Sequence, residues 1–350
     1  MIRVLKNTLE ASVWIFSTVL VICGCVASWL IYPGSPGSAE HLAFQGYIVL
    51  PKTGILSVLD YLTISDHRLF VTEESSGNVY KIALRAEMLP GESDISTFAL
   101  EPATHGVAID PVSQMAYVTR SEANTVDVFD PAHMKLSKRI SVADDPDGIF
   151  YEPLHKVLYV ASGDAHLATV IDPAAGAIVA TIPLDGKPEF AAYDPQSHIM
   201  YQNLRDTNSV VAVDLDSKTV ANRWALQGCE GPSGMTLDDA NRRLFIVCSG
   251  NAALVVFDLI RKTVIATVKI GGGPDSVAYD VALHRIYTTG KSGVLVVIQQ
   301  ETPDAYHVID TVHLHYGAHT LAVDSDTHRL YVGYAGLIVP PRVAVFMSRS

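Results

Sequence analysis

The chain has 350 residues and a mass of 37.8 kDa, so it is too long for one ordinary core and fits two domains or one large repetitive domain. Apolar residues make up 49% of it and charged residues 18%, which excludes wholesale disorder. The net charge of −12 makes a phosphate backbone an unfavourable partner, so we expect no nucleic-acid partner. The 4 cysteines include no Cys-x-x-Cys pair that would suggest zinc or haem attachment.

Residues 1–39 have the features of an export segment. Arg3 and Lys6 precede residues 11–32, a stretch without any charged side chain. At ~1.5 Å per residue, a helix of this length reaches ~33 Å and is able to cross a bilayer. Because the basic residues come first, we expect the chain that follows to lie on the outer side of a membrane. The Pro-, Gly- and Ser-rich residues 33–38 predict a flexible tether to a domain that spans residues 40–350.

Three fates of this segment stay open. An uncleaved membrane anchor is favoured because the apolar residues continue through Trp29, Leu30 and Ile31. The run that ends at Cys25 resembles a bacterial lipobox, in which Cys25 would be acylated. A signal peptidase would instead cut after Ala27 or Ala39, where small residues occupy the required positions. All three place the remainder on the periplasmic or extracellular side, and the first two make the membrane itself a partner.

An internal repeat follows. Seven aromatic residues, here called the anchors, recur every 42 to 47 residues: Phe70, Tyr117, Tyr159, Tyr201, Phe245, Tyr287 and Tyr331. Six of them have an acidic residue seven positions earlier: Asp110, Glu152, Asp194, Asp238, Asp280 and Asp324. The first repeat has Thr63 in that place. A missed repeat misassigns the whole fold, so this pattern takes precedence over local propensities.

Each repeat has the composition of antiparallel sheet. In the second repeat, residues 106–110, 115–119, 125–129 and 136–140 are short apolar or alternating runs with turn residues between them. Four strands in a unit of this length predict one blade of a β-propeller, so we expect an all-β, seven-bladed propeller preceded by an apolar helix. The repeated acid is expected to bond turn amides, and the anchors to pack between blades.

Two runs, Tyr117–Arg120 and Tyr159–Ser162, resemble the core of the YVTN repeat, as do Asn124–Asp130 and Asn208–Asp214. This resemblance covers about residues 55–347 and implies a seven-bladed, WD40-like propeller of the YncE-like kind. It implies little about activity, since propellers host many unrelated functions. The last repeat ends after a third strand, and residues 47–50 are predicted to supply the fourth and close the ring.

The expected site is the mouth of the central channel, where the loops that enter the innermost strands converge. Five residues before the repeated acid, the equivalent positions hold a ring of mostly polar side chains: Val58, His105, Asp147, Glu189, Ser233, Asp275 and His319. These form either a ligand-binding ring or a solvated rim. Arg120 and Arg205 end second strands near this rim, where they would hold an anionic group or pair with acids.

No catalytic residue is identified and no cofactor is certain, but His105, Asp275 and His319 are candidate ligands of a divalent metal ion. The run from His313 through His315 to His319 looks like a metal motif. However, its first two histidines are expected on an outer strand and His319 at the start of an inner one, about 14 Å away, so the three should not converge. The leading function is an exported, membrane-tethered module that binds a small molecule or protein partner at the rim. The alternative is a metal-dependent, lactonase-type hydrolase or lyase, so whether the chain is an enzyme stays open.

The cysteines of the fifth repeat carry a separate expectation. Cys229 lies in the loop that enters this repeat, and Cys248 ends its second strand at the same rim. In an oxidising compartment these two predict a disulfide, with two buried free thiols as the alternative.

Overall fold

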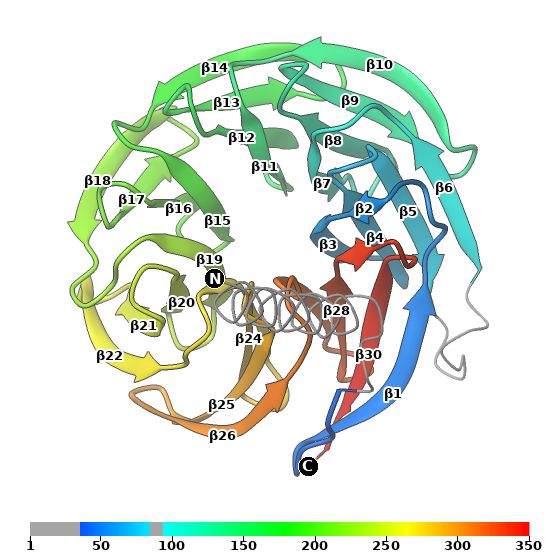
Figure 1. The fold of residues 1–350 in the computed structure, drawn as a ribbon. Helices are drawn as coiled ribbons and strands as arrows, with labels where there is room; N and C mark the ends of the chain where they lie inside the picture. Colours follow the sequence, from blue (N-terminus) through cyan, green and yellow to red (C-terminus); the bar gives the residue numbers. More distant parts are fainter. Residues whose placement is uncertain (1–35, 85–93, 350) are drawn as a thin grey trace, which may run out of the picture.

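The computed structural model describes residues 36–84 and 94–349, which form a ring of seven four-stranded antiparallel sheets (Figure 1). This confirms the predicted all-β propeller. The apolar helix, the lipobox and the first half of the tether expected in residues 1–39 lie outside the described residues. Within the described ranges, no helix is long and apolar enough to cross a membrane.

Blades one to three contain, from the innermost strand outward, β3 (Leu59–Ser65), β4 (Arg68–Glu73), β5 (Asn78–Ala83), β6 (Ile95–Ala99); β7 (Thr104–Ile109), β8 (Ala116–Arg120), β9 (Thr125–Asp130), β10 (Lys135–Ser141); and β11 (Pro146–Glu152), β12 (Val157–Ser162), β13 (Leu167–Asp172), β14 (Ala177–Pro183). Blades four to six contain β15 (Pro188–Asp194), β16 (Ile199–Leu204), β17 (Ser209–Asp214), β18 (Thr219–Ala225); β19 (Pro232–Asp238), β20 (Arg243–Cys248), β21 (Ala253–Asp258), β22 (Thr263–Lys269); and β23 (Pro274–Asp280), β24 (Arg285–Gly290), β25 (Val294–Thr302), β26 (Ala305–His313). Blade seven contains β27 (Thr320–Asp324), β28 (Arg329–Tyr334), β30 (Arg342–Ser348) and β1 (Leu42–Val49).

The two ends of the described chain meet in blade seven. The strand β1 pairs antiparallel with β30, from Leu42 opposite Ser348 to Val49 opposite Arg342, so an N-terminal strand completes the last blade (Figure 1). Leu42 and Ile48 of β1 are buried against neighbouring side chains of the ring. The pairing covers the edge that β30 would otherwise expose.

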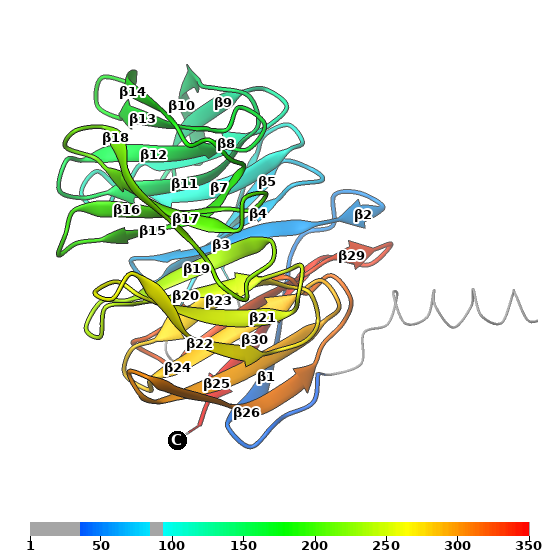
Figure 2. The same cartoon turned by 90° about the vertical axis from the view of Figure 1, so that its left-hand side faces the viewer.

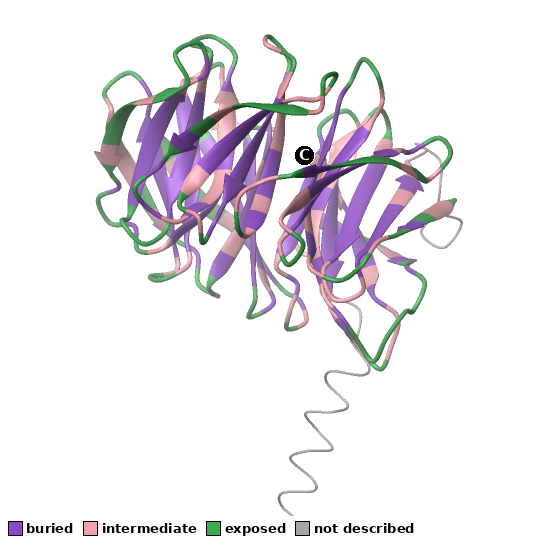
Figure 3. Cartoon of the chain, turned by 90° about the horizontal axis from the view of Figure 1, so that it is seen from above, coloured by how far each residue is buried: buried purple, intermediate pink, exposed green. Residues whose placement is uncertain are grey.

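The core lies between adjacent blades. All seven anchors are buried, and each cluster mixes side chains of two neighbours, as where Tyr117 of blade two packs with Leu158 of blade three. The outermost strands β10, β14, β18 and β22 are mostly exposed, whereas the second and third strands of these blades are mostly buried (Figure 3). Burial of one such aromatic side chain stabilises the fold by roughly 2–3 kcal/mol, which explains why a large ring recurs at this position.

The repeated acids bond turn amides, as predicted. Asp110 Oδ1, for example, accepts from the amide of Val112 at 2.9 Å. Blade one needs no such acid because Asp66 and His67, with φ of 48° and 53°, make a two-residue turn of the I′ kind between β3 and β4. The hairpin is therefore two residues shorter in blade one than in the others. Counting back from the turn consequently misplaces residues of that blade.

Candidate functional site

A cavity of about 680 Å³ lies at one mouth of the central channel. Its walls come from the loops that enter the innermost strands and the loops that follow the second strands. A small ribbon of β2 (Leu56–Ser57) and β29 (Gly336–Leu337) projects beyond the ring on this side and supplies part of the rim (Figure 2). The cavity therefore lies where the sequence predicted a ring of polar side chains.

The strand register defines which residues are equivalent. In blade two Thr104 pairs with Arg120, three residues after the anchor, and in blade one Leu59 pairs with Glu73 in the same way. We call the residue that directly follows Leu59, Thr104 or the equivalent residue of another blade the ring position. The ring position of blade one is therefore Asp60, and the choice of Val58 from the sequence was wrong because it ignored the shorter hairpin. The missing acid of the first repeat was the signal that would have revealed this.

The structure brings six of the seven ring positions to the cavity: Asp60, His105, Asp147, Glu189, Asp275 and His319. Ser233 does not reach it. Its side chain is fully buried and its hydroxyl donates to the carbonyl of Pro274 at 3.2 Å. The ring thus has a gap at blade five, where the chain uses a small side chain for contact with the next blade.

The two arginines expected at the rim differ. Arg205 lines the cavity and its guanidinium donates to Glu189 at 2.9 Å. Arg120 is 3% exposed, and its guanidinium contacts Glu101 at 2.6 Å and Asp127 at 3.6 Å. Arg120 therefore holds blade two together and offers nothing to an anionic ligand. The difference follows from position, because Arg120 stands three residues after its anchor, in the strand, and Arg205 stands four after, in the loop.

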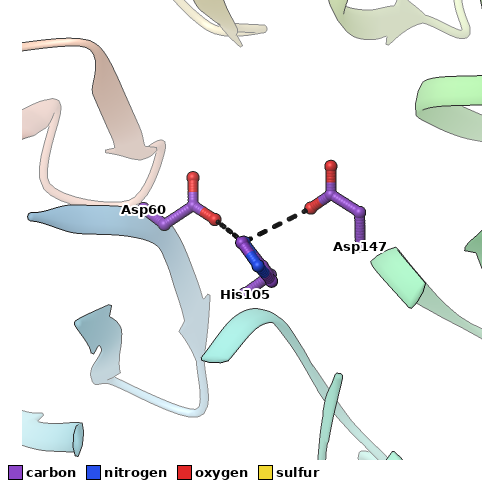
Figure 4. A group of neighbouring side chains, drawn as sticks. All are labelled: Asp60, His105 and Asp147. Carbon is purple, nitrogen blue, oxygen red and sulfur yellow. Dashed lines mark hydrogen bonds and ion pairs between the residues drawn. The ribbon is translucent and has the colours of Figure 1, made fainter. Parts of the chain in front are cut away.

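Three ring positions of consecutive blades meet in a compact group (Figure 4). His105 Nδ1 lies 2.6 Å from Asp60 Oδ2 and 3.9 Å from Asp147 Oδ1. The other imidazole nitrogen of His105, Nε2, is 2.9 Å from the Ser121 hydroxyl. Among the described His, Cys, Asp and Glu residues, this is the group of three whose potential ligand atoms all lie within 4.8 Å of one another.

The metal-ligand set predicted from the sequence does not meet that distance. Asp275 and His319 line the same cavity as His105, but they come from blades six and seven, and Asp275 lies 3.6 Å from Lys291 of its own blade. Only His105 belongs to both the predicted and the observed group. His315 also lines the cavity, from the loop after β26, while His313 ends that strand, so the three-histidine run does not converge on one point.

The group is electrostatically unusual. Burial opposes the charged form of His105, but the hydrogen bond with Asp60 and the charges of Asp60 and Asp147 raise its pKa to about 9. Burial, reinforced by the Asp60 charge, raises the pKa of Asp147 above its usual range. Burial also raises the pKa of Tyr61, and the nearby charge of Asp147 adds to this rise. The group therefore places two carboxylates beside a single imidazole in a partly buried setting.

Two aromatic rings form the floor of the cavity. Tyr61 of blade one and Phe190 of blade four stack with their centroids 5.0 Å apart and their planes 18° from parallel. Both rings also line a second cavity of about 520 Å³ farther along the channel. Each follows its ring position directly, where the other five blades have small residues: Gly106, Gly148, Gly234, Ser276 and Thr320. This floor was not predicted from the sequence, although large aromatic residues at a position that is otherwise small were a signal for it.

Cys229 and Cys248 form a disulfide in the structure, with their Cα atoms 5.2 Å apart. Both are buried next to the loop that enters blade five. Residues 230–247 are thereby closed into a loop that contains the innermost strand of the blade.

Comparison with known proteins identifies the fold alone. No protein-family model matches the chain, and no curated protein matches it. Among solved structures, virginiamycin B lyase from Staphylococcus aureus has a TM-score of 0.70 at 13% identity over 88% of this chain and 100% of that chain. The WD40 repeats of RRP9 have a TM-score of 0.70 at 11% identity over 91% and 100%. Hydrazine synthase from Kuenenia stuttgartiensis has a TM-score of 0.67 at 16% identity over 85% and 94%.

Proposed function

We propose that this chain is an exported, membrane-tethered binding module that holds a small molecule, or a segment of a protein partner, in the cavity at the channel mouth. The observation that supports this most is convergence. Six of seven equivalent positions on different blades direct polar side chains to one cavity of about 680 Å³. That volume lies within the range of sites for drug-sized ligands.

The chemistry of the walls favours a ligand of mixed polarity. Arg205 pairs with Glu189 and Lys291 with Asp275, so part of the acidic ring is neutralised by bases of the same blades. Tyr61 and Phe190 present an aromatic floor. An apolar body that stacks on the floor, with polar groups that reach the ring, fits this combination.

A compound screen tests the binding proposal. We expect a library of aromatic amines and carboxylic acids to contain compounds that raise the unfolding temperature of the full chain. Val58→Trp places a large ring in the cavity, which Val58 lines, and should reduce those shifts. The matched control is Val281→Trp, at a residue 53% exposed in the turn after β23, on the face of the ring away from this cavity. Shifts of unchanged size in Val58→Trp, or a library without any stabilising compound, would contradict the proposal.

Export and tethering have their own test. The apolar residues 11–32, preceded by Arg3 and Lys6, support an exported domain. Expressed in a bacterium, the full chain should fractionate with membranes and be digested by protease added to spheroplasts. A chain that begins at residue 40 should stay in the cytosol. Full chain that is protected from external protease would overturn this part of the proposal.

A metal-dependent hydrolase or lyase of the lactonase type is the second candidate. The observation that favours it is the close approach of two carboxylates and one imidazole at the mouth, since a metal there would polarise a carbonyl group of a substrate. The candidate predicts turnover of lactones or aryl esters that requires added metal and stops when Val58 is replaced by Trp. Binding of screened compounds without turnover would leave the binding module as the function.

A further inference from the structure

Asp60, His105 and Asp147 occupy the same structural position on three consecutive blades. Each directly follows a residue that is paired across the first hairpin and lies within the register shift of that hairpin, so the three residues are equivalent. The Asp147 carbonyl also accepts from the Thr119 hydroxyl of blade two at 2.5 Å. A Cβ atom at Gly106, which follows His105, would lie 2.7 Å from that same carbonyl. Blades two and three are therefore in backbone contact at this level, which holds His105 and Asp147 at a fixed separation.

We infer that Asp60, His105 and Asp147 bind one divalent first-row transition metal ion at the channel mouth, with its remaining coordination positions open to the cavity. The inference rests on the proposed function in one respect only: the ligand of this cavity would carry a group that binds to the metal. One imidazole and two carboxylates suit zinc, manganese or iron better than calcium, which takes six to eight oxygen ligands. An open coordination position would accept a carboxylate, hydroxyl or carbonyl oxygen of the ligand.

An unsatisfied atom supports the site independently of the spacing. Asp147 Oδ1 is itself buried and has no hydrogen-bond partner, and it is the oxygen that faces His105 Nδ1 at 3.9 Å. A carboxylate oxygen that loses water without gaining a donor costs free energy. A cation between Oδ1, Nδ1 and Asp60 Oδ2 would remove that cost (Figure 4).

The surroundings of His105 match those of a metal ligand. Its Nε2 is 2.9 Å from Ser121 Oγ, so with a metal on Nδ1 the Nε2–H group donates to that hydroxyl and fixes the plane of the imidazole. Metal binding releases one proton: the metal replaces the proton on His105 Nδ1 that is hydrogen-bonded to Asp60, and that proton leaves to solvent. For tetrahedral zinc, ligand atoms lie about 3.3 Å apart. The 2.6 Å separation of Nδ1 and Asp60 Oδ2 must therefore widen by about 0.7 Å, and the 3.9 Å separation of Nδ1 and Asp147 Oδ1 must shorten by about 0.6 Å, for the three atoms to reach one ion.

The experiment measures binding of the metal alone. Full chain with Cys23→Ser and Cys25→Ser, which removes thiols that bind zinc, is titrated calorimetrically with ZnCl₂ and, in parallel, with MnCl₂. We expect one tight site per chain for at least one of these metals. Asp147→Asn and His105→Ala should each lower the affinity for that metal at least tenfold. Asp275→Asn and His319→Ala, at ring positions of the same cavity outside the group, should leave it unchanged.

The outcomes separate this inference from the proposed function. Absence of a stoichiometric site for either metal, or equal affinity in parent and Asp147→Asn, overturns the metal site. Loss of affinity in Asp275→Asn and His319→Ala but not in Asp147→Asn would overturn it as well. Asp147→Asn preserves the shape of the side chain, and its thermal unfolding verifies that the ring is intact. The binding module stands if compounds bind the parent equally with and without EDTA and bind Val58→Trp more weakly. The metal site is decided by the titrations alone.

Discussion

Asp194 shows how a turn carboxylate of the repeat also joins two blades. Its side chain is fully buried, accepts from the Gln196 amide and the Ser197 hydroxyl, and receives two bonds from the Arg242 guanidinium of blade five. Burial opposes the charge of Asp194, but the bonds from Arg242 and Ser197 outweigh it and lower its pKa. We expect Asp194→Asn to lower the free energy of unfolding by about 2–4 kcal/mol, since it leaves Arg242 without its buried partner.

The pH dependence tests the cause. Because the pKa of Asp194 is lower in the folded than in the unfolded chain, its stabilising effect is complete above the unfolded value of ~4 and is lost as the pH falls through the folded value. The difference between parent and Asp194→Asn in urea unfolding should be constant above about pH 5 and shrink below about pH 4. Asp239→Asn is the matched control, since Asp239 also contacts Arg242 at 2.9 Å but is 43% exposed. It should cost less than about 1 kcal/mol.

The disulfide between Cys229 and Cys248 should protect the innermost strand of blade five. A bond that closes a loop of this length contributes roughly 3 kcal/mol in the chain-entropy view. Protein taken from an exporting host, denatured without reductant and treated with iodoacetamide should leave both cysteines unmodified, whereas reduced protein should gain two labels at these positions and unfold at lower urea. Alkylation of both thiols without reductant would refute the bond.

At the scale of strands and turns, much of this fold was predictable from the sequence, because a repeat tests the same inference seven times. The anchors and acids fixed six of the seven first hairpins and the ring positions on them. Blade one failed since the I′ turn at Asp66 and His67 has no acid and removes two residues. Arg120 pairs with acids, which is one of the two roles predicted for it. A shift of one residue along the strand explains why its side chain lies in the blade while that of Arg205 lies at the rim.

The closing strand β1 carries a prediction at this scale. A chain that begins at residue 53 would lack β1 and leave β30 with an unpaired edge and an uncovered apolar face. Loss of the buried Leu42 and Ile48 side chains alone removes roughly 4–5 kcal/mol, so we expect an unfolding temperature at least ~10 °C lower than in a chain that begins at residue 36. Calorimetry of the two chains makes the comparison. Equal unfolding temperatures would show that β1 does not close the ring.

At the scale of the whole molecule, the place of the cavity was predictable from the sequence, but the grouping of the side chains that line it was not. The repeat identifies equivalent positions, so it predicted that side chains at one offset converge. It does not report how far each side chain reaches, and the approach of Asp147 to His105 and Asp60 depends on the separation of blades one, two and three. The floor was missed because Tyr61 and Phe190 break the pattern of small residues at the next offset in only two blades. In this propeller, the positions where a blade departs from the repeat, such as Tyr61 and Phe190, are the ones that give the cavity its aromatic floor.

The floor predicts an energetic link across the channel. Tyr61 and Phe190 belong to blades one and four, which share no strand pairing, yet their rings stack at 5.0 Å. Stacked aromatic pairs contribute about 0.5–1.5 kcal/mol beyond the area they bury. A double-mutant cycle with Tyr61→Ala and Phe190→Ala, followed by urea unfolding, should therefore give a coupling free energy in this range.

The control for that cycle pairs Tyr61→Ala with Tyr306→Ala, because Tyr306 lies on the outermost strand of blade six, against Phe245 rather than Tyr61. Those two substitutions should be additive within about 0.5 kcal/mol. Tyr61→Phe keeps the stack while it removes only the hydroxyl, so it should retain the coupling with Phe190. A coupling near zero for Tyr61 with Phe190, or one no larger than the control, would mean that the two rings share the channel without holding blades one and four together.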